Sequence, residues 1–281
     1  MKRMNNICSM SGNWRNSSRW QFLQLWGLDA PITAICWSVA CAALMQVTMI
    51  TPGPMLLVAS CVWCANMQHR VRDAIKHPES WNSAFYRGHL PIILVLLFAV
   101  SMATLWMMLF YVGQNILPYL ILPAGLYGIR GILPHTCLEP VRLLLKSIAF
   151  AMVCAVPAFY FCFTLTPFHL LTTGPIWYLG ILFFLMARER QQLRTKEKNY
   201  QYVVVNTITL LMLLSATLIS SVTAPMFERT LCITIAIGAG CLQGFSRILH
   251  LLPPGMALAF GWLSMAIPAV LGIILYAPHS W

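Results

Sequence analysis

Apolar stretches of about twenty residues recur along the whole chain, and this recurrence limits the fold more than any single motif does. A helix needs roughly 17–25 predominantly apolar residues to cross the hydrocarbon core of a bilayer. The chain has 281 residues, of which 59% are hydrophobic and only 9% are charged. Soluble domains carry roughly 25% charged residues, so a soluble enzyme, a secreted disulfide scaffold and a disordered chain are excluded. The sequence predicts a polytopic membrane protein.

We expect nine spans, and with them an all-α fold. The expected spans are 31–50, 52–67, 90–112, 115–133, 143–163, 167–187, 202–222, 229–250 and 253–277. The sixth span contains Gly174-Pro175, which predicts a kink because a proline inside a helix removes a backbone hydrogen bond. Residues 1–30 are expected to form a cytoplasmic tail and an interfacial segment, and residues 31–281 a single transmembrane domain.

The basic residues lie almost entirely on one side of these spans. Of the 18 Lys and Arg residues, all but Arg229 fall in the N-terminal tail or in alternate connections. The positive-inside rule therefore places the N-terminus in the cytoplasm and the C-terminus on the opposite side. Because the positive charge lies in short connections between apolar spans, it indicates contact with the lipid bilayer rather than nucleic-acid binding.

Two connections on the predicted cytoplasmic side are long and polar. They run from Asn66 to Leu90 and from Ala187 to Tyr200. Six of the seven carboxylates lie on this side of the chain, Glu228 being the exception. Long polar loops at one end of a helical bundle are a common place for a site. The alternative is that both are solvated loops in contact with lipid headgroups.

Two segments and their placement resemble a known family. The segment Phe22–Ile32 (FLQLWGLDAPI) is similar to an L-x-R-L-D-K-P-I motif that leads into a first helix. The segment Ala65–Pro78 (ANMQHRVRDAIKHP) resembles an aspartate-rich loop of the form N-D-x-x-D-R-x-x-D. The first long connection follows the second span, and the second long connection follows the sixth. The two aspartate-rich loops have the same placement in the UbiA-type family of intramembrane prenyltransferases. The resemblance implies nine transmembrane helices around a central cavity that opens to the cytoplasmic side.

The acidic motifs of this family are depleted here. Aligning Asp73 with the third acidic position leaves Asn66 and His69 at the first two, while Arg70 keeps the arginine. The second motif, Ala187–Gln191 (ARERQ), keeps only Glu189. In the family these carboxylates hold Mg²⁺, which binds the diphosphate of a prenyl donor. The resemblance therefore implies that Asp73 and Glu189 are the catalytic and metal-binding residues for a single Mg²⁺, since a magnesium pair cannot be assembled.

Arginine can bind phosphate oxygens directly, because its planar guanidinium forms two parallel hydrogen bonds. Basic residues at or beside the depleted positions are therefore candidates to replace metal. Tyr127 and Arg130 fall where the family often carries a Tyr and a Lys or Arg, and Tyr178 could stabilise an allylic cation with its ring face. The candidate substrate-binding residues are Asn66, His69, Arg70, Arg72, Tyr127, Arg130, Tyr178, Arg188, Arg190 and Arg194.

Simpler interpretations of several of these residues remain open. Asp73 and Glu189 could pair with neighbouring basic side chains in solvent, and Asn66 could cap the second span. Arg188 and Arg190 could anchor the sixth span at the membrane surface.

The expected function is that of a divergent prenyltransferase of isoprenoid biosynthesis. It would transfer an isoprenyl group from a prenyl diphosphate to a small aromatic acceptor, or cyclise the prenyl chain. The alternative is a non-catalytic membrane subunit that binds isoprenoid or lipid and supports a partner membrane enzyme, because a fold does not fix a function.

Overall fold

The computed structural model describes residues 25–45, 47, 51–76, 83–112, 114–133, 139–162, 166–195, 200–249, 266–271 and 273–274. Within these ranges the chain is helical and contains no strand, which confirms the predicted all-α class. The helices are α3 (Asp29–Leu44), α4 (Pro52–Lys76), α5 (Ser83–Gly88), α6 (Leu90–Trp106), α7 (Leu117–Ile132), α8 (Glu139–Phe161), α9 (His169–Thr172), α10 (Gly174–Thr195), α11 (Tyr200–Thr223) and α12 (Met226–Leu249). A π-helical turn, Met107–Val112, and a 3-10 turn, Gln114–Ile116, connect α6 to α7.

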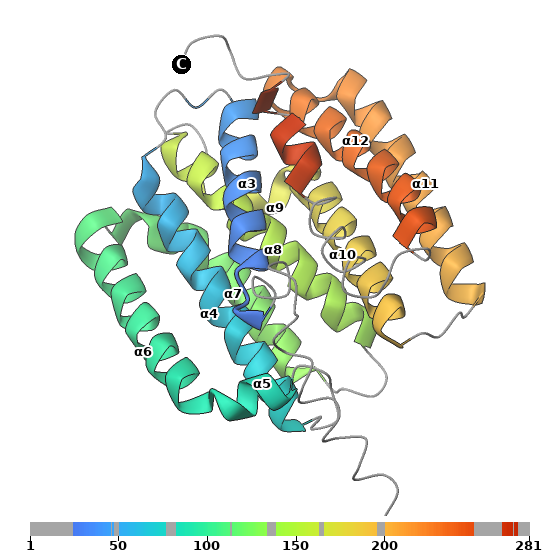
Figure 1. Ribbon diagram of the computed structural model, residues 1–281. Coiled ribbons are helices and arrows are strands. Elements are labelled where there is room, and N and C mark those ends of the chain that lie inside the picture. The colour runs from blue at the N-terminus through green and yellow to red at the C-terminus, as the bar shows by residue number, and fades with distance from the viewer. Residues whose placement is uncertain are drawn as a thin grey trace, which may run out of the picture.

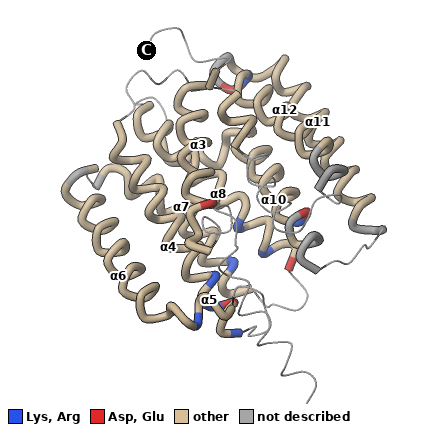
Figure 2. The backbone as a smooth tube through the Cα atoms, viewed as in Figure 1, with Lys and Arg blue, Asp and Glu red and all other residues tan. Residues whose placement is uncertain are grey.

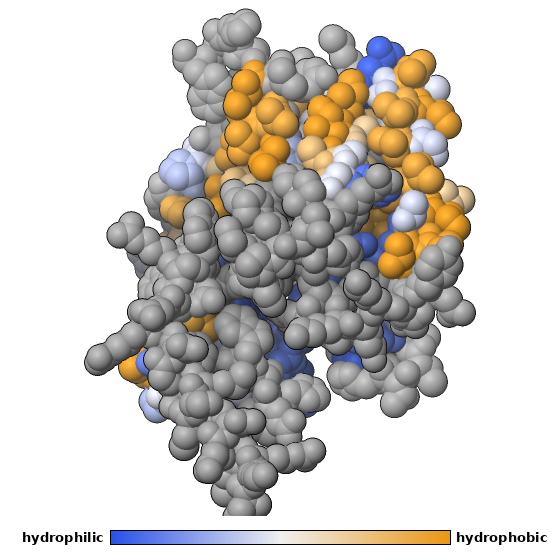
Figure 3. All heavy atoms as spheres, turned by 45° about the vertical axis from the view of Figure 1, so that its right-hand side comes forward, coloured by the Kyte–Doolittle hydropathy of each residue, from blue (hydrophilic) through white to orange (hydrophobic). Residues whose placement is uncertain are grey.

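Each of the first eight predicted spans overlaps one of these helices, whereas most of the ninth lies outside the described residues. Three described helices are long and apolar enough to cross a membrane: Leu90–Phe110, Glu139–Phe161 and Val203–Thr223. The first and third lie at opposite flanks of the bundle and are largely exposed (Figure 1). On the face turned forward in Figure 3, hydrophobic surface covers much of the upper and right-hand described area. These features support a membrane protein.

The middle of the bundle is formed by α3 and α8 (Figure 1). Helix α3 packs against α4, α8 and α12, and α8 also packs against α7 and α10. Small side chains such as Ala34, Ala151 and Ala155 are buried here and allow close helix contact. Trp37 is fully buried and packs edge-to-face on Phe183 with 5.8 Å between the ring centroids. Helices α3, α8 and α10 therefore contribute to one buried hydrophobic core.

The first polar connection is mostly helical, contrary to the expected loop from Asn66 to Leu90. Helix α4 continues to Lys76, and α5 follows at Ser83–Gly88. The extension is amphipathic: Met67 and Ala74 are buried, while Arg72 and Asp73 are exposed. Such a stripe keeps a helix packed after its sequence has become too polar for a membrane.

The second polar connection is also largely helical. Helix α10 continues to Thr195, eight residues beyond the predicted end of the sixth span at residue 187. At its other end the sixth span is interrupted beside Gly174-Pro175 by a break between two helices rather than by a kink within one, because α9 ends at Thr172 and α10 begins at Gly174. Pro175 thus lies in the first turn of a new helix, where its missing N–H costs no hydrogen bond.

Gly27 shapes the turn that leads into α3. It has φ 65°, in the left-handed region, and a Cβ there would lie 2.8 Å from Met67 Sδ. We expect Gly27→Ala to destabilise the protein by about 1–3 kcal/mol, because an L side chain is strained at this φ. Thermal unfolding of the purified protein measures this change. Gly128→Ala is the control, since its Cβ would meet nothing within 4 Å; equal melting temperatures for the two variants would contradict the prediction.

Candidate functional site

The Lys and Arg residues that the structure describes lie mostly toward one end of the bundle, its lower part in Figure 2. Successive long helices run in alternating directions, so the end of α4, the end of α7, the start of α8 and the end of α10 lie at the same level (Figure 1). We term this the basic end. Cross-helix hydrogen bonds confirm the placement, because Arg142 Nε donates to Arg130 O at 3.1 Å and Gln191 Nε2 to Glu139 Oε1 at 3.0 Å.

The strongest charge pair at the basic end joins Arg70 to Asp29. Arg70 Nη2 donates to both carboxylate oxygens of Asp29, at 2.8 Å to Oδ1 and 2.7 Å to Oδ2. The Asp29 side chain is 4% exposed and that of Arg70 14%. Arg70 Nε also donates to Asn66 Oδ1 at 3.3 Å. This pair fastens the start of α3 to α4, which gives Arg70 a structural partner that the sequence did not predict.

The turn before α3 is held by side chains that bind its backbone. Asn66 Nδ2 donates to Gly27 O at 3.2 Å, and Trp63 Nε1 donates to Trp26 O at 2.9 Å. From α5, the Tyr86 hydroxyl donates to Leu25 O at 2.6 Å. Asn66 therefore lies within α4 rather than at a helix end, and its predicted role in substrate binding stays a prediction. It bridges the turn and Arg70, and we refer to Asp29, Trp63, Asn66, Arg70 and Tyr86 together as the Asp29 network.

His69 directly precedes Arg70 of this network on α4, and it lies among cations from three helices. Its Nε2 is 3.5 Å from Asp73 Oδ2, and its side chain is 31% exposed. Burial lowers the pKa of His69 to about 3, together with the positive charges of Lys146, Arg130, Arg70 and Arg72. The imidazole is therefore neutral at pH 7, despite its contact with Asp73. We call His69, Arg72, Arg130 and Lys146 the cationic cluster.

Arg130 stands out within the cationic cluster. Its Nε is buried and has no hydrogen-bond partner among the described residues. The guanidinium carbon lies 5.3 Å from the centroid of the Tyr127 ring, so the ring stacks against the cation and holds it in place. A buried donor without an acceptor costs free energy, and buried polar groups of this kind are usually satisfied by a ligand, water or ion. The structure thus brings Tyr127 and Arg130 together, and their predicted role in substrate binding stays a prediction.

The cationic cluster carries a net positive charge. Among the described side chains that surround His69, Arg72, Arg130 and Lys146 supply three positive charges and Asp73 supplies one negative charge. Arg70 is balanced by Asp29 and adds nothing to this balance. An excess of this kind at a partly buried position attracts a multivalent anion such as a phosphate or diphosphate. The arrangement can therefore bind a phosphorylated group without metal.

The two predicted metal ligands, Asp73 and Glu189, lie on separate helices. Asp73 is on α4 and Glu189 is on α10, and α8 packs against both helices. Glu189 Oε1 accepts a hydrogen bond from Asn206 Nδ2 of α11 at 3.0 Å. Among the described residues no group of three or more His, Cys, Asp and Glu side chains could hold a metal ion. The residues present do not fit a magnesium pair, and a single ion held by Asp73 and Glu189 stays a prediction.

The remaining predicted residues are on α10. Arg188 lies over the Phe184 ring, 5.5 Å from its centroid. Tyr178 donates to or accepts from Ser220 Oγ at 3.1 Å. Since a helix rises 1.5 Å per residue, Tyr178 is about 15 Å along α10 from Arg188, and its predicted role toward an allylic cation stays a prediction. Arg190 and Arg194 have side chains outside the described part of the structure.

Two residues that contribute most to the geometry were not among the predicted site residues. Lys146 follows Arg142 by four residues near the start of an apolar helix, a spacing that places both side chains on one face. That spacing was available in the sequence as a signal. Asp29 lies 41 residues from its partner Arg70, and nothing in a single sequence indicates this pairing.

Comparison of the chain with protein-family models, with curated proteins and with solved structures gives no match. A functional assignment therefore depends on the residues themselves and on their arrangement.

Proposed function

We propose that this protein binds an isoprenyl diphosphate at the cationic cluster and transfers the isoprenyl group to a small aromatic acceptor, as a divergent member of the UbiA-type family. The observation that carries the proposal is the buried Arg130 Nε, which has no hydrogen-bond partner in the part of the chain that the structure describes and lies among cations from α4, α7 and α8. A diphosphate would supply acceptor atoms for this donor and the negative charge that offsets the excess.

The proposed topology has nine transmembrane helices with the basic end in the cytoplasm. Three helices of sufficient length and apolar composition support membrane insertion, and the alternating helix directions support a multi-pass chain. The gathering of Lys and Arg at one end supports the orientation, because cytoplasmic connections carry an excess of these residues. A prenyl donor would then enter from the cytoplasmic side with its chain directed into the bundle.

The proposed chemistry follows from charge neutralisation. The allylic C–O bond breaks heterolytically, and the diphosphate leaves with the electron pair. Arg72, Arg130 and Lys146 stabilise the negative charge that develops on the leaving oxygen, as preorganised cations do in other transfer reactions. The acceptor carbon or oxygen then forms a bond to the prenyl carbon and releases a proton to solvent. Without an acceptor, an internal double bond of the prenyl chain would attack the allylic cation and close a ring, and the new carbocation would lose a proton to solvent to give an alkene.

Binding and turnover of labelled donors test this proposal. Purified protein in lipid nanodiscs is incubated with geranyl, farnesyl or geranylgeranyl diphosphate and a panel of small phenolic acceptors, with Mg²⁺ or with EDTA. We expect saturable binding of at least one donor that persists in EDTA, because the site consists of side-chain cations. We also expect diphosphate release that depends on the acceptor. Absence of binding for every donor would overturn the proposal.

A second candidate is a non-catalytic membrane subunit that binds an isoprenoid or another lipid for a partner enzyme. The engagement of Glu189 by Asn206 favours it, since that carboxylate already has a structural partner. The same experiment separates the two functions. Donor binding without diphosphate release, for any acceptor and with either Mg²⁺ or EDTA, would support the subunit and contradict the transferase.

A further inference from the structure

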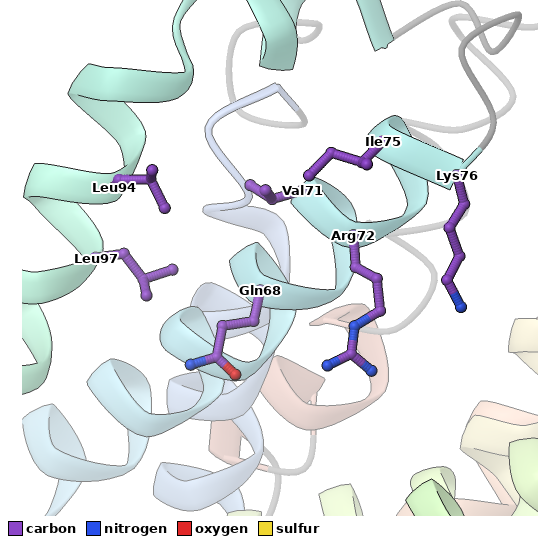
Figure 4. A pocket seen from close by; sticks show the side chains of 7 residues that line it. All are labelled: Gln68, Val71, Arg72, Ile75, Lys76, Leu94 and Leu97. Carbon is purple, nitrogen blue, oxygen red and sulfur yellow. The ribbon is translucent and has the colours of Figure 1, made fainter.

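A groove lies between α4 and α6 at the basic end (Figure 4). It has a volume of about 360 Å³ and an open mouth. Its apolar wall consists of Val71 and Ile75 from α4 and Leu94 and Leu97 from α6, and its polar wall consists of Gln68, Arg72 and Lys76. The groove is on the flank of the bundle where α6 is exposed, so in a bilayer it faces lipid.

The two walls follow from helical spacing. Gln68, Arg72 and Lys76 recur every four residues and form one polar row on α4. Val71 and Ile75 form the adjacent apolar row. The leucine side chains of α6 point toward α4, and Arg72 and Lys76 extend away from them (Figure 4). The groove is therefore apolar at one side and cationic at the other.

The position of the groove along α6 sets its depth in a membrane. The candidate span begins at Leu90, so Leu94 and Leu97 lie one and two turns inside it. This is the boundary between lipid headgroups and hydrocarbon, where a Lys or Arg head can reach phosphate while its stem stays among apolar atoms. Ile75 is 61% exposed and Leu94 51% exposed, so the described protein leaves both for another molecule to cover.

We propose that this groove binds one anionic glycerophospholipid from the leaflet at the basic end. An acyl chain would cover Val71, Ile75, Leu94 and Leu97, and the phosphate and anionic headgroup would accept hydrogen bonds from Arg72 and Lys76. We take the occupant as anionic because the lining that the structure describes holds two cations and no carboxylate. Asp73, which follows Arg72 in the sequence, contacts His69 on a different face of α4.

This site is separate from the proposed donor site, although Arg72 belongs to both. Lys76 lines the groove but is not among the cations that act on His69. Lys76→Gln therefore reports on the groove alone. Arg87→Gln is the matched control, because Arg87 is an exposed cation on α5 at the same end of the molecule and outside the groove.

Lipid titration tests the proposal. Purified protein in mild detergent is titrated with phosphatidylglycerol or phosphatidylcholine of identical acyl chains, and native mass spectrometry counts bound lipid. We expect phosphatidylglycerol to bind at one saturable site and more tightly than phosphatidylcholine. Lys76→Gln is expected to weaken the binding of phosphatidylglycerol about fivefold and to leave the binding of phosphatidylcholine unchanged. We expect the same result for Arg72→Gln. Leu97→Ser is expected to weaken the binding of both lipids, because it removes part of the apolar wall of the groove.

Three results would overturn the proposal. One is an equal loss in Arg87→Gln and Lys76→Gln, which would mean diffuse attraction to charge. Another is full competition by soluble glycerol phosphate, which would mean a phosphate site without a lipid. The third is an unchanged preference for phosphatidylglycerol in the Arg72→Gln/Lys76→Gln double variant. Melting temperatures without added lipid show that each variant is folded.

Discussion

Asp29→Ala and Arg70→Ala are each expected to lower the stability of the folded protein by about 3–5 kcal/mol, because each leaves a buried charge without its partner. The pair is bidentate, with Nη2 to oxygen distances of 2.8 and 2.7 Å, and both side chains are largely shielded from solvent. Unfolding of the purified protein in mixed detergent micelles with increasing denaturant measures the change in free energy.

The double variant Asp29→Ala/Arg70→Ala is expected to lose much less stability than the sum of the losses in the two single variants, since neither charge then remains without its partner. Asp73→Ala is the surface control, because its side chain is 52% exposed and its loss is expected to change stability by less than about 0.5 kcal/mol. If Arg70→Ala were as stable as Asp73→Ala but bound no prenyl diphosphate, Arg70 would be a ligand residue and its structural role would be wrong.

Arg130→Gln is expected to weaken prenyl diphosphate binding by about tenfold to a hundredfold, because a hydrogen bond to a charged group contributes roughly 1.5–3 kcal/mol. The Nε of Arg130 has no partner among the described residues, so the substitution breaks no hydrogen bond at that atom. Lys146→Gln is expected to weaken binding in the same direction. Equilibrium binding of a fluorescent prenyl diphosphate analogue in EDTA provides the measurement.

The conservative variant Arg130→Lys separates geometry from charge. It keeps the positive charge but loses the planar fork that matches phosphate oxygens, so we expect an intermediate loss of affinity. Arg229→Gln is the control, because Arg229 is exposed at the start of α12, at the opposite end of the bundle. Unchanged affinity in both Arg130→Gln and Lys146→Gln would show that the cationic cluster does not bind the diphosphate.

Hydropathy and charge were sufficient to predict most of the helices and the collection of cations at one end. They failed where a helix continued beyond its apolar part. Between Asn66 and Lys76 the chain reads as a polar loop, yet Met67 and Ala74 are buried and keep α4 helical. A window average conceals this periodicity, because charged residues on the exposed face outweigh the few apolar residues on the other.

The candidate site was predicted in part. Arg130 and Tyr127 lie together, and the positive charges of Arg130 and Arg72 both lower the pKa of His69. The predicted binding roles of Arg70 and Asn66 did not take Asp29 into account, because this aspartate was assigned to an entry segment without a partner.

The turn before α3 is recognised through three peptide carbonyl oxygens, those of Leu25, Trp26 and Gly27. Every amino acid carries such an oxygen. Evolution can therefore replace Leu25 or Trp26 without losing these hydrogen bonds, provided that the spacing from Gly27 to Asp29 is kept. A one-residue deletion in this stretch would be far more damaging than a substitution, because it would offset all three acceptors from their donors at once.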